Sequence, residues 1–277
     1  MAKFGGFTAA SRRIVPWPGG GTAFAKGATD DPTEDWLRIE HFAYTHLAGG
    51  FMPRLLGWDD SGERPVLYLE DLASARWPPP WLLGDEELVL AALAKLHSAT
   101  PPPGLVRAET RWPNDWPRIG ADSEPFLRLG LVSSGWFEAH LPALSAAAER
   151  VPLAGDAVIH MDVRSDNLCF LEGRALLVDW NLIALGNPAA DAQFWLPSLV
   201  LEGGRPPVEL EPEFAAWITG FMASRAGLPL IPTAPGVRAI QLAQLRVVLP
   251  WACRLLGLAP PDGPEEFRRA GPGINFT

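Results

Sequence analysis

Alternating apolar and polar positions near the start of the chain predict a small sheet. Residues 12–17 and 22–26 each favour a strand, and Gly19-Gly20-Gly21 between them favours a hairpin turn. Residues 66–69 form another apolar run that favours a strand. Residues 36–47 carry apolar side chains at positions 36, 39, 43 and 47, which is a helical spacing. This part of the chain therefore predicts a small antiparallel sheet with one helix.

Longer amphipathic segments occupy most of the remaining chain. Pro101-Pro102-Pro103 ends one helix, and we expect Pro142 to interrupt a second helix and Pro250 to kink or divide a third. Short apolar strands are expected at 157–159 and 175–178. The sequence thus predicts an α+β fold whose larger part is mainly helical. The predicted helices are 86–97, 136–150, 213–225 and 239–256.

Two neighbouring segments carry the candidate chemistry. The segment from His160 to Asn167 places Asp162 and Asn167 five positions apart in a turn, and Asp179 follows at the end of the apolar run 175–178. Each residue alone has an ordinary explanation as a turn or capping residue. Together they have the spacing of a kinase active site, where one carboxylate takes a hydroxyl proton while an amide oxygen and a second carboxylate hold magnesium against nucleotide phosphates. The pattern predicts a phosphotransferase.

A strand lysine and a helix glutamate precede this pattern. Lys26 ends the alternating strand 22–26, and Glu40 lies within the helical segment 36–47. An ion pair between such residues orders an active kinase site and brings the ammonium group to the α- and β-phosphates. The alternative is that both charges are simply solvated, as most lysines and glutamates are. Their order before the Asp162 loop favours the ion pair.

A glycine pair near the start of the chain is a candidate for covering phosphates. Gly5 and Gly6 allow the backbone to approach phosphate oxygens, and Thr8 adds a hydroxyl. Gly19-Gly20-Gly21 is the competing candidate, which we interpret as the hairpin turn. We therefore expect Gly5, Gly6 and Thr8 to bind the nucleotide.

These motifs resemble those of the aminoglycoside phosphotransferase family, which shares the protein-kinase fold and includes choline and other small-molecule kinases. The resemblance runs from about Gly5 to about Asp191. It rests on the His160–Asn167 segment, on the strand that ends Val178-Asp179-Trp180, and on similarity around Phe24-Ala25-Lys26. It implies a two-lobed fold, with a small antiparallel sheet and one helix in the first lobe and a larger, mainly helical second lobe.

The resemblance also implies roles for individual residues. Asp162 is the implied catalytic base or hydroxyl-orienting residue, and Asn167 and Asp179 are the implied magnesium ligands. Glu70 and Leu72 fall in the implied hinge, whose backbone pairs with the nucleotide base, although an ordinary exit from a strand explains the same residues. The hinge places the lobe boundary near Asp71. Residues 1–71 would form the nucleotide-binding lobe, and residues 72–277 the catalytic and acceptor-binding lobe.

Three further residues near the proposed base have predicted roles. Arg164 stands two residues beyond Asp162, where a guanidinium could offset the charge of the transferring phosphoryl group. Equally, Arg164 could simply pair with Asp166 or another carboxylate. His160 is expected to hold the backbone in place and not to transfer protons. We expect Asp191 to brace the loop by hydrogen bonds.

Length and composition agree with this plan. The chain has 277 residues, of which 48% are hydrophobic, enough for a substantial or two-lobed core. Cys169 and Cys253 provide neither a disulfide framework nor a metal-binding spacing. The sequence contains no recognisable signal peptide and no uncharged apolar span of membrane length. These features predict a cytoplasmic protein.

The formal net charge of −9 disfavours nucleic acid and anionic membranes as partners. The same charge would suit a cationic acceptor. Candidate carboxylates for such a site include Asp115 and Asp122, within residues 109–122, but solvated loops are the favoured explanation for them. The acceptor itself is not fixed by these patterns.

The sequence as a whole predicts a kinase that uses magnesium to move the γ-phosphate of ATP or GTP to a hydroxyl of a small molecule. The acceptor could be an aminoglycoside, another antibiotic or an amino-alcohol. A catalytically silent relative that binds a nucleotide or a partner protein is the alternative from a different class. The presence of Asp162, Asn167 and Asp179 favours the enzyme.

Overall fold

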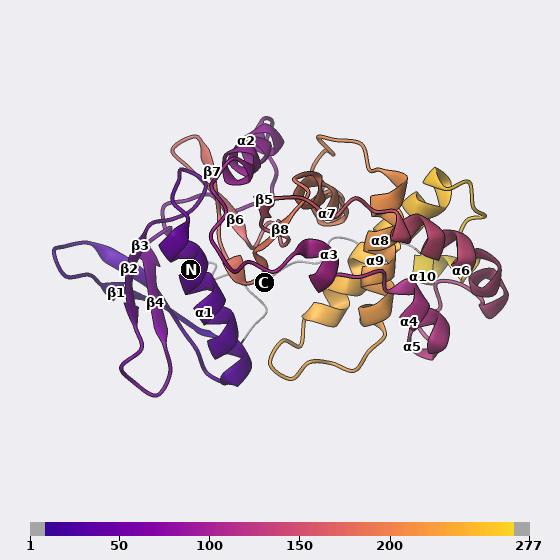
Figure 1. The fold of residues 1–277 in the computed structure, drawn as a ribbon, viewed down its shortest axis with the longest axis horizontal. Helices are drawn as coiled ribbons and strands as arrows, with labels where there is room; N and C mark the ends of the chain where they lie inside the picture. The colour runs from indigo at the N-terminus through magenta and orange to yellow at the C-terminus, as the bar shows by residue number, and fades with distance from the viewer. Residues whose placement is uncertain (1–8, 269–277) are drawn as a thin grey trace. The chain divides into compact units, whose positions relative to one another are not determined.

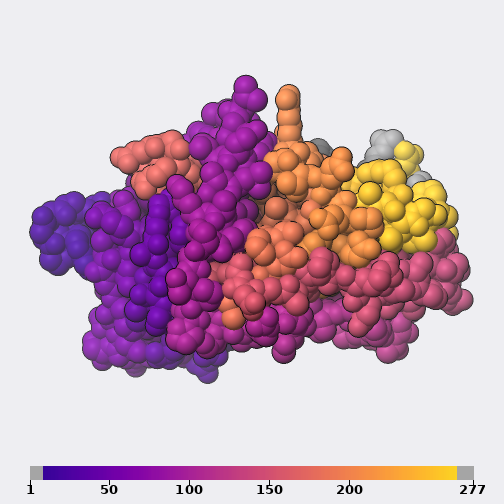
Figure 2. Space-filling model, turned by 45° about the horizontal axis from the view of Figure 1, so that its top comes forward, coloured from indigo at the N-terminus to yellow at the C-terminus, as the bar shows by residue number. Residues whose placement is uncertain are grey.

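Four antiparallel strands form the first sheet of the computed structural model, which describes residues 9–268. The strands lie in the order β1-β2-β4-β3 (Figure 1). Gly19, Gly20 and Gly21 all have positive φ angles in the turn between β1 and β2, which explains the three glycines there. Figure 2 shows the tip of this hairpin projecting at the indigo end of the molecule. The strands are β1 (Ser11–Pro16), β2 (Thr22–Gly27), β3 (Leu55–Asp59) and β4 (Val66–Glu70).

Helix α1 (Asp31–His46) packs against β3 and β4 (Figure 1). It begins earlier than the apolar spacing predicts, because Asp30 and Thr33 form a capping box in which each side chain bonds to the other's backbone N–H. The buried face of α1 includes Leu37, Glu40 and Tyr44. Burial of a glutamate within this apolar face indicates that it has a partner.

Two further hairpin-like pairs surround the candidate catalytic loop. Strand β5 pairs with β8, and β6 pairs with β7, all antiparallel. Glu172 and Gly173 both have positive φ angles in the tight turn between β6 and β7. The helix α2 packs on β5 and β7. These elements are α2 (Asp85–His97), β5 (Ala157–Ile159), β6 (Leu168–Leu171), β7 (Arg174–Leu177), the 3₁₀ turn η1 (Trp180–Leu182) and β8 (Ala184–Gly186).

The other elements are helical and pack around α8, which contacts α4, α5, α6 and α9. Large aromatic side chains fill their core, among them the fully buried Trp116, Phe126, Phe214 and Trp217. The Trp116 indole donates a hydrogen bond to the Ala216 carbonyl at 2.9 Å, so its polar atom is satisfied inside the core. The helices are α3 (Ala108–Arg111), α4 (Trp116–Ala121), α5 (Glu124–Leu127), α6 (Ser134–Glu149), α7 (Ala189–Leu201), α8 (Pro212–Ala226), α9 (Val237–Leu255) and α10 (Glu265–Arg268).

The predicted interruption at Pro142 is wrong, and Pro250 does not divide its helix. Pro142 lies inside the continuous helix α6, and Pro250 lies inside the continuous helix α9. A proline inside a helix costs about 3 kcal/mol, because it removes one backbone hydrogen bond and crowds the preceding turn. Both helices pack extensively against α8, and that burial of apolar surface outweighs the local cost.

The described chain divides into two compact units. The first comprises the residues up to Val106 together with Gly155–Asp191, and the second comprises Arg107–Ala154 together with the residues from Ala192 onward. The predicted lobe boundary near Asp71 lies inside the first unit and stays a prediction. Among the described residues, no helix has the length and apolar character needed to cross a membrane.

Candidate active site

A buried carboxylate fixes the backbone of the candidate catalytic loop. Asp191 accepts hydrogen bonds from the backbone N–H of His160 at 3.0 Å and from that of Met161 at 2.7 Å. The His97 ring lies 2.9 Å from the same carboxylate. Met161 has a φ of 62°, a left-handed conformation that a residue with a side chain adopts only when its surroundings impose it. Asp191 therefore braces this loop, as predicted.

His160 is a structural residue. The backbone N–H of Asp162 donates to its Nδ1 at 3.2 Å, so Nδ1 is unprotonated and Nε2 carries the proton. Nε2 lies 3.0 Å from the Val178 carbonyl, which accepts that proton in a hydrogen bond. The ring also meets the Trp180 ring edge-on, with centroids 4.6 Å apart. Burial lowers the pKa of His160, which keeps the ring neutral and suits this arrangement.

Asn167 and Asp162 are joined directly. The side-chain amide of Asn167 donates to Asp162 Oδ2 at 2.7 Å and to the Asp162 backbone carbonyl at 3.0 Å. The Val178 N–H donates to the Asn167 backbone carbonyl at 2.9 Å, which ties the loop to the segment that carries Asp179. Burial raises the pKa of Asp162, although Arg164 acts against the rise.

Arg164 lies among the carboxylates of its own loop. Its guanidinium is 3.1 Å from Asp166 Oδ2 and 3.3 Å from Asp162 Oδ1. The pairing with Asp166 that the sequence left open is therefore present, and a contact with the proposed base accompanies it. Arg164 offsets the repulsion between these two buried carboxylates.

Lys26 stands between two carboxylates. Its ammonium pairs with Glu40 of α1 and lies 3.1 Å from Asp179 Oδ1. Burial alone would lower the pKa of Lys26, but the charges of Asp179 and Glu40 outweigh it and raise the pKa above its usual value. Glu40 is only 1% exposed, and this burial raises its pKa to about 8 against the opposing pull of Lys26. The ammonium of Lys26 therefore contacts two carboxyl groups, one on α1 and one in the Asp179 segment.

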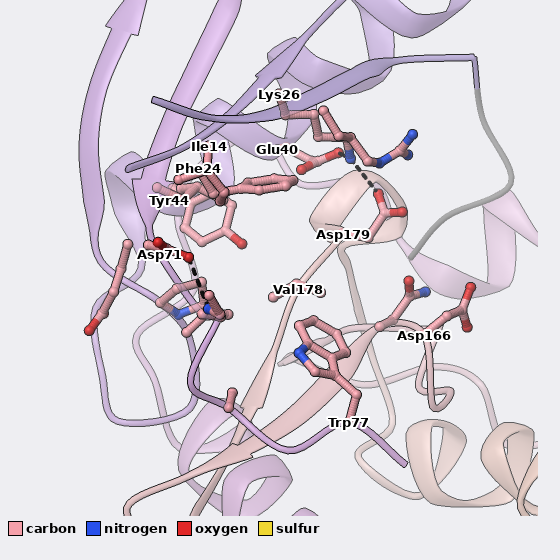
Figure 3. A pocket seen from close by; sticks show the side chains of 18 residues that line it. Ile14, Phe24, Lys26, Glu40, Tyr44, Asp71, Trp77, Asp166, Val178 and Asp179 are labelled. Carbon is pink, nitrogen blue, oxygen red and sulfur yellow. Dashed lines mark hydrogen bonds and ion pairs between the residues drawn. The ribbon is translucent and has the colours of Figure 1, made fainter. Parts of the chain in front are cut away.

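The backbone at Asp179, like that at Met161, has a left-handed conformation with a positive φ angle. Asp179 has φ 64° and ψ 63° at the point where β7 gives way to the turn η1. The left-handed conformation directs the chain into the turn and holds the carboxylate beside Lys26 (Figure 3). Burial would raise the pKa of Asp179, but Lys26 outweighs that effect and holds the pKa well below its usual range. Asp179 is therefore ionised.

A cavity of about 360 Å³, a size typical of small-molecule sites, is lined by several of these groups. Part of its wall is apolar and comes from the sheet and from the segment before Asp179 (Figure 3). The ionic wall contains Lys26, Glu40 and Asp179, which converge in Figure 3. Asn167 also lines the cavity, whereas Asp162 is not part of the lining and is hydrogen-bonded to Asn167. The apolar lining includes Ile14, Phe24, Leu69, Leu72 and Val178.

A model of the phosphotransferase enzyme family matches residues 22–226 of the sequence, which is more than half of its length. The chain belongs to the phosphotransferase enzyme family. The resemblance to the aminoglycoside phosphotransferase family that the motifs indicate is thereby confirmed, and so is the prediction of a phosphotransferase. A search of curated protein sequences found no match to this phosphotransferase.

Two solved structures have a similar fold. One is a choline/ethanolamine kinase family protein from Mesorhizobium loti, with a TM-score of 0.53 and 15% identity, covering 88% of this chain and 91% of that protein. The other is a macrolide 2'-phosphotransferase type I, with a TM-score of 0.50 and 15% identity, covering 95% of this chain and 86% of that protein. At 15% identity, these comparisons show that the chain shares the fold of the two proteins, and they show no more than that. They confirm the predicted kinase-like α+β fold.

The remaining predicted nucleotide contacts divide into two groups. Gly5, Gly6 and Thr8 lie outside the described residues. Glu70 and Leu72 line the cavity together with Asp71. The N–H of Glu70 donates to the Arg54 carbonyl at 2.9 Å, and the Leu72 carbonyl accepts from Ala75 N–H at 3.0 Å, so those two backbone groups of the hinge are engaged within the protein.

The donor set suits magnesium better than zinc. The Asn167 amide nitrogen bonds to Asp162, which leaves the amide oxygen and the Asp179 carboxylate as oxygen donors on one cavity. Magnesium is commonly held by one or two such side chains, with waters and phosphate oxygens completing its octahedron. In the part of the chain that the structure describes, no cluster of three or more histidine, cysteine or acidic side chains offers a self-sufficient metal site.

Sequence reasoning missed several cavity residues, among them Arg12, Ile14, Tyr44 and Trp77. Arg12 and Ile14 lie two positions apart on β1 and both line the cavity. Because side chains two positions apart on a strand share one face, the sequence could have predicted that they lie on the same side of the sheet. Tyr44 lies one helical turn after Glu40 on α1, and its buried hydroxyl has no hydrogen-bond partner among the described residues. Trp77 lies in a stretch with no regular period, so no sequence signal places it at the cavity.

Asp115, a candidate for binding a cationic acceptor, already forms ion pairs with two arginines. It is buried, pairs with Arg225 and lies 3.0 Å from the Arg118 guanidinium. The Ser224 hydroxyl donates to it at 3.1 Å. This carboxylate therefore stabilises the helical unit. Asp122 is exposed, as expected for a solvated position.

Proposed function

We propose that this phosphotransferase moves the γ-phosphate of ATP or GTP to a hydroxyl group of a small molecule, with magnesium as cofactor. One observation carries the proposal: a single cavity has an apolar part next to the hinge and an ionic part formed by Lys26, Asn167 and Asp179. A nucleotide has a matching division, because its base is largely apolar and its phosphates are charged. Membership of a phosphotransferase family supplies the reaction class.

The nucleotide would lie along the sheet. Its base fits the apolar wall formed by Ile14, Phe24 and Val178, close to Glu70 and Leu72. Its phosphates fit the ionic wall, where Lys26 is already held in place by Glu40. Because Glu40 fixes the lysine before a ligand arrives, the ammonium loses little freedom on binding phosphate. Gly5, Gly6 and Thr8 remain the proposed cover of the phosphates.

Asn167 and Asp179 would hold magnesium, which would supply positive charge to offset that of the nucleotide phosphates. Asp179 is suited to this role because Lys26 keeps it ionised. Asn167 is suited because its hydrogen bonds to Asp162 use the amide nitrogen and direct the oxygen away. The two oxygen donors are therefore held in defined orientations before the cation arrives.

Asp162 is the proposed base. The acceptor hydroxyl oxygen forms a bond to the γ-phosphorus, the bond from that phosphorus to the β,γ-bridging oxygen breaks, and the hydroxyl proton passes to the Asp162 carboxylate. Its raised pKa makes the carboxylate a stronger proton acceptor than an ordinary aspartate. Arg164, at 3.3 Å from Asp162, opposes that rise in pKa, and we assign Arg164 a further role in offsetting charge on the transferring phosphoryl group.

The acceptor is proposed to be an amino-alcohol, an aminoglycoside or another antibiotic with a free hydroxyl. The two structures of similar fold are described as a choline/ethanolamine kinase family protein and a macrolide 2'-phosphotransferase, which are enzymes of this general kind. The net charge of −9 supports a cationic acceptor over nucleic acid or an anionic membrane. Use of a nucleoside triphosphate supports a cytoplasmic location, where such nucleotides are abundant.

The test is a screen of hydroxylated amines, aminoglycosides, macrolides and sugars, with nucleotide consumption as the readout and nucleotide binding measured in parallel. Transfer to at least one acceptor, with a requirement for magnesium, is the expected result. Tight nucleotide binding without consumption in any acceptor's presence would favour the catalytically silent alternative. Absence of both binding and turnover would reject the nucleotide site.

A further inference from the structure

A second cation shares the cavity with Lys26. Arg12 on β1 lies directly opposite Lys26 on β2 in the antiparallel register, and both residues line the cavity. Residues that pair directly across two strands project to the same face of the sheet. Arg13, the next residue, pairs with Ala25, is exposed and is not part of the cavity wall. Two consecutive arginines thus occupy opposite faces of one strand.

The sheet face that carries Arg12 and Lys26 changes from apolar to cationic along the strands. Ile14 pairs with Phe24, which in turn pairs with Leu69 just before the hinge, so this part of the face is apolar. Two residues farther from the hinge, about 7 Å along a strand, the paired residues are Arg12 and Lys26. A nucleotide whose base lies at the apolar part would extend its phosphates toward the two cations.

Charge balance favours a second cationic side chain beside Lys26, in addition to magnesium. The cavity wall carries five acidic side chains, at Glu40, Glu70, Asp71, Asp166 and Asp179, against two cationic ones at Arg12 and Lys26. Lys26 is already matched by the carboxylates of Glu40 and Asp179. A polyphosphate entering this wall adds more negative charge. Lys26 alone would leave that charge poorly balanced.

Arg12 is held in a defined position. One of its guanidinium nitrogens donates to the Ala10 carbonyl at 2.8 Å. A guanidinium carries five donors in a planar fork, so this anchor is compatible with a bidentate contact to phosphate.

We propose that Arg12 binds the phosphate chain of the nucleotide beyond the α-phosphate, as the partner of Lys26 on the neighbouring strand. The proposal rests on the proposed nucleotide site and adds a binding residue to it. Arg12 makes the site selective for di- and triphosphates over the monophosphate and the nucleoside, because only the longer chains reach the guanidinium.

The experiment compares Arg12→Ala with Arg13→Ala in binding to adenosine, AMP, ADP and ATP, or to the guanosine series if the wild-type protein prefers GTP. Loss of charge-assisted hydrogen bonds predicts that Arg12→Ala weakens triphosphate binding about ten- to a hundredfold, with little effect on the nucleoside. Arg13→Ala should match the wild type for every ligand. Arg12→Lys should recover part of the loss, since it restores the charge but not the fork.

Three outcomes separate the possible failures. If Arg12→Ala binds the triphosphate as tightly as Arg13→Ala while Lys26→Ala binds it weakly, the inference is wrong and the nucleotide site stands. If Arg12→Ala weakens the nucleoside and the triphosphate equally, Arg12 supports the cavity wall and does not contact phosphate, which also overturns the inference. If the wild-type protein binds neither ATP nor GTP, the proposed function fails and the inference fails with it. Thermal unfolding of each variant verifies that it is folded.

Discussion

The side-chain amide of Asn167 donates a 2.7 Å hydrogen bond to the carboxylate of Asp162. The same nitrogen also reaches the Asp162 backbone carbonyl at 3.0 Å. One side chain thereby orients the proposed base with its nitrogen and offers its oxygen to the proposed magnesium site. Substitution of Asn167 should therefore change both turnover and metal dependence.

Magnesium dependence should distinguish the two proposed ligands. Asp179→Asn should weaken magnesium-dependent nucleotide binding more than Asn167→Ala does, because a charged oxygen holds a hard cation more strongly than a neutral amide oxygen. The measurement is a magnesium titration at fixed nucleotide for the wild type and both variants. Identical magnesium dependence in all three proteins would rule out this metal site.

Stability should fall in mild acid because of His160. In the unfolded chain a histidine titrates near pH 6.5, whereas burial lowers the pKa of His160 in the folded protein. Between those two pKa values the unfolded chain binds one more proton, so the free energy of unfolding decreases as the pH falls below about 6.5, by up to about 1.4 kcal/mol per pH unit.

Replacing His160 isolates this effect. The difference in unfolding free energy between the wild type and His160→Asn should shrink as the pH is lowered from 7 to 5.5, because all other titrating groups are common to both proteins. Denaturant unfolding at several pH values provides the measurement. A difference that stays constant over this range would show that His160 does not remain neutral in the folded protein.

Asp115 and Asp122 should differ in their effect on stability. Asp115→Asn removes the charge that Arg118 and Arg225 share, so we expect the free energy of unfolding to fall by about 1–3 kcal/mol. Asp122→Asn changes an exposed position and should stay within about 0.5 kcal/mol of the wild type. Urea unfolding of the two variants compares them directly. Equal, small losses would mean that the Asp115 ion pairs contribute nothing to stability.

The sequence predicted those parts of the site that depend on short-range patterns. The spacing from Asp162 to Asn167 and the run before Asp179 are local, and the strand and helix that carry Lys26 and Glu40 have clear periods. The ion pair between Lys26 and Glu40 is present in the structure. Their roles in catalysis stay predictions.

Features that depend on distant partners could not be predicted. Strand β3 (Leu55–Asp59) is short and only partly buried, and its pairing with β4 through an irregular register defines it. The helices containing Pro142 and Pro250 are continuous because of their packing on α8. Asp115 has the local sequence of a solvated loop carboxylate, but it pairs with Arg225, which lies far along the chain. In each case a tertiary contact outweighs the local signal.

Phosphoryl transfer by Asp162→Ala tests the central claim most directly. Because this carboxylate does not line the nucleotide cavity and is proposed to face the acceptor hydroxyl, its removal should lower turnover by about a hundredfold or more while nucleotide affinity changes little. Turnover and nucleotide affinity are measured on the same preparation, with the best acceptor from the screen. Wild-type turnover in Asp162→Ala would contradict the account.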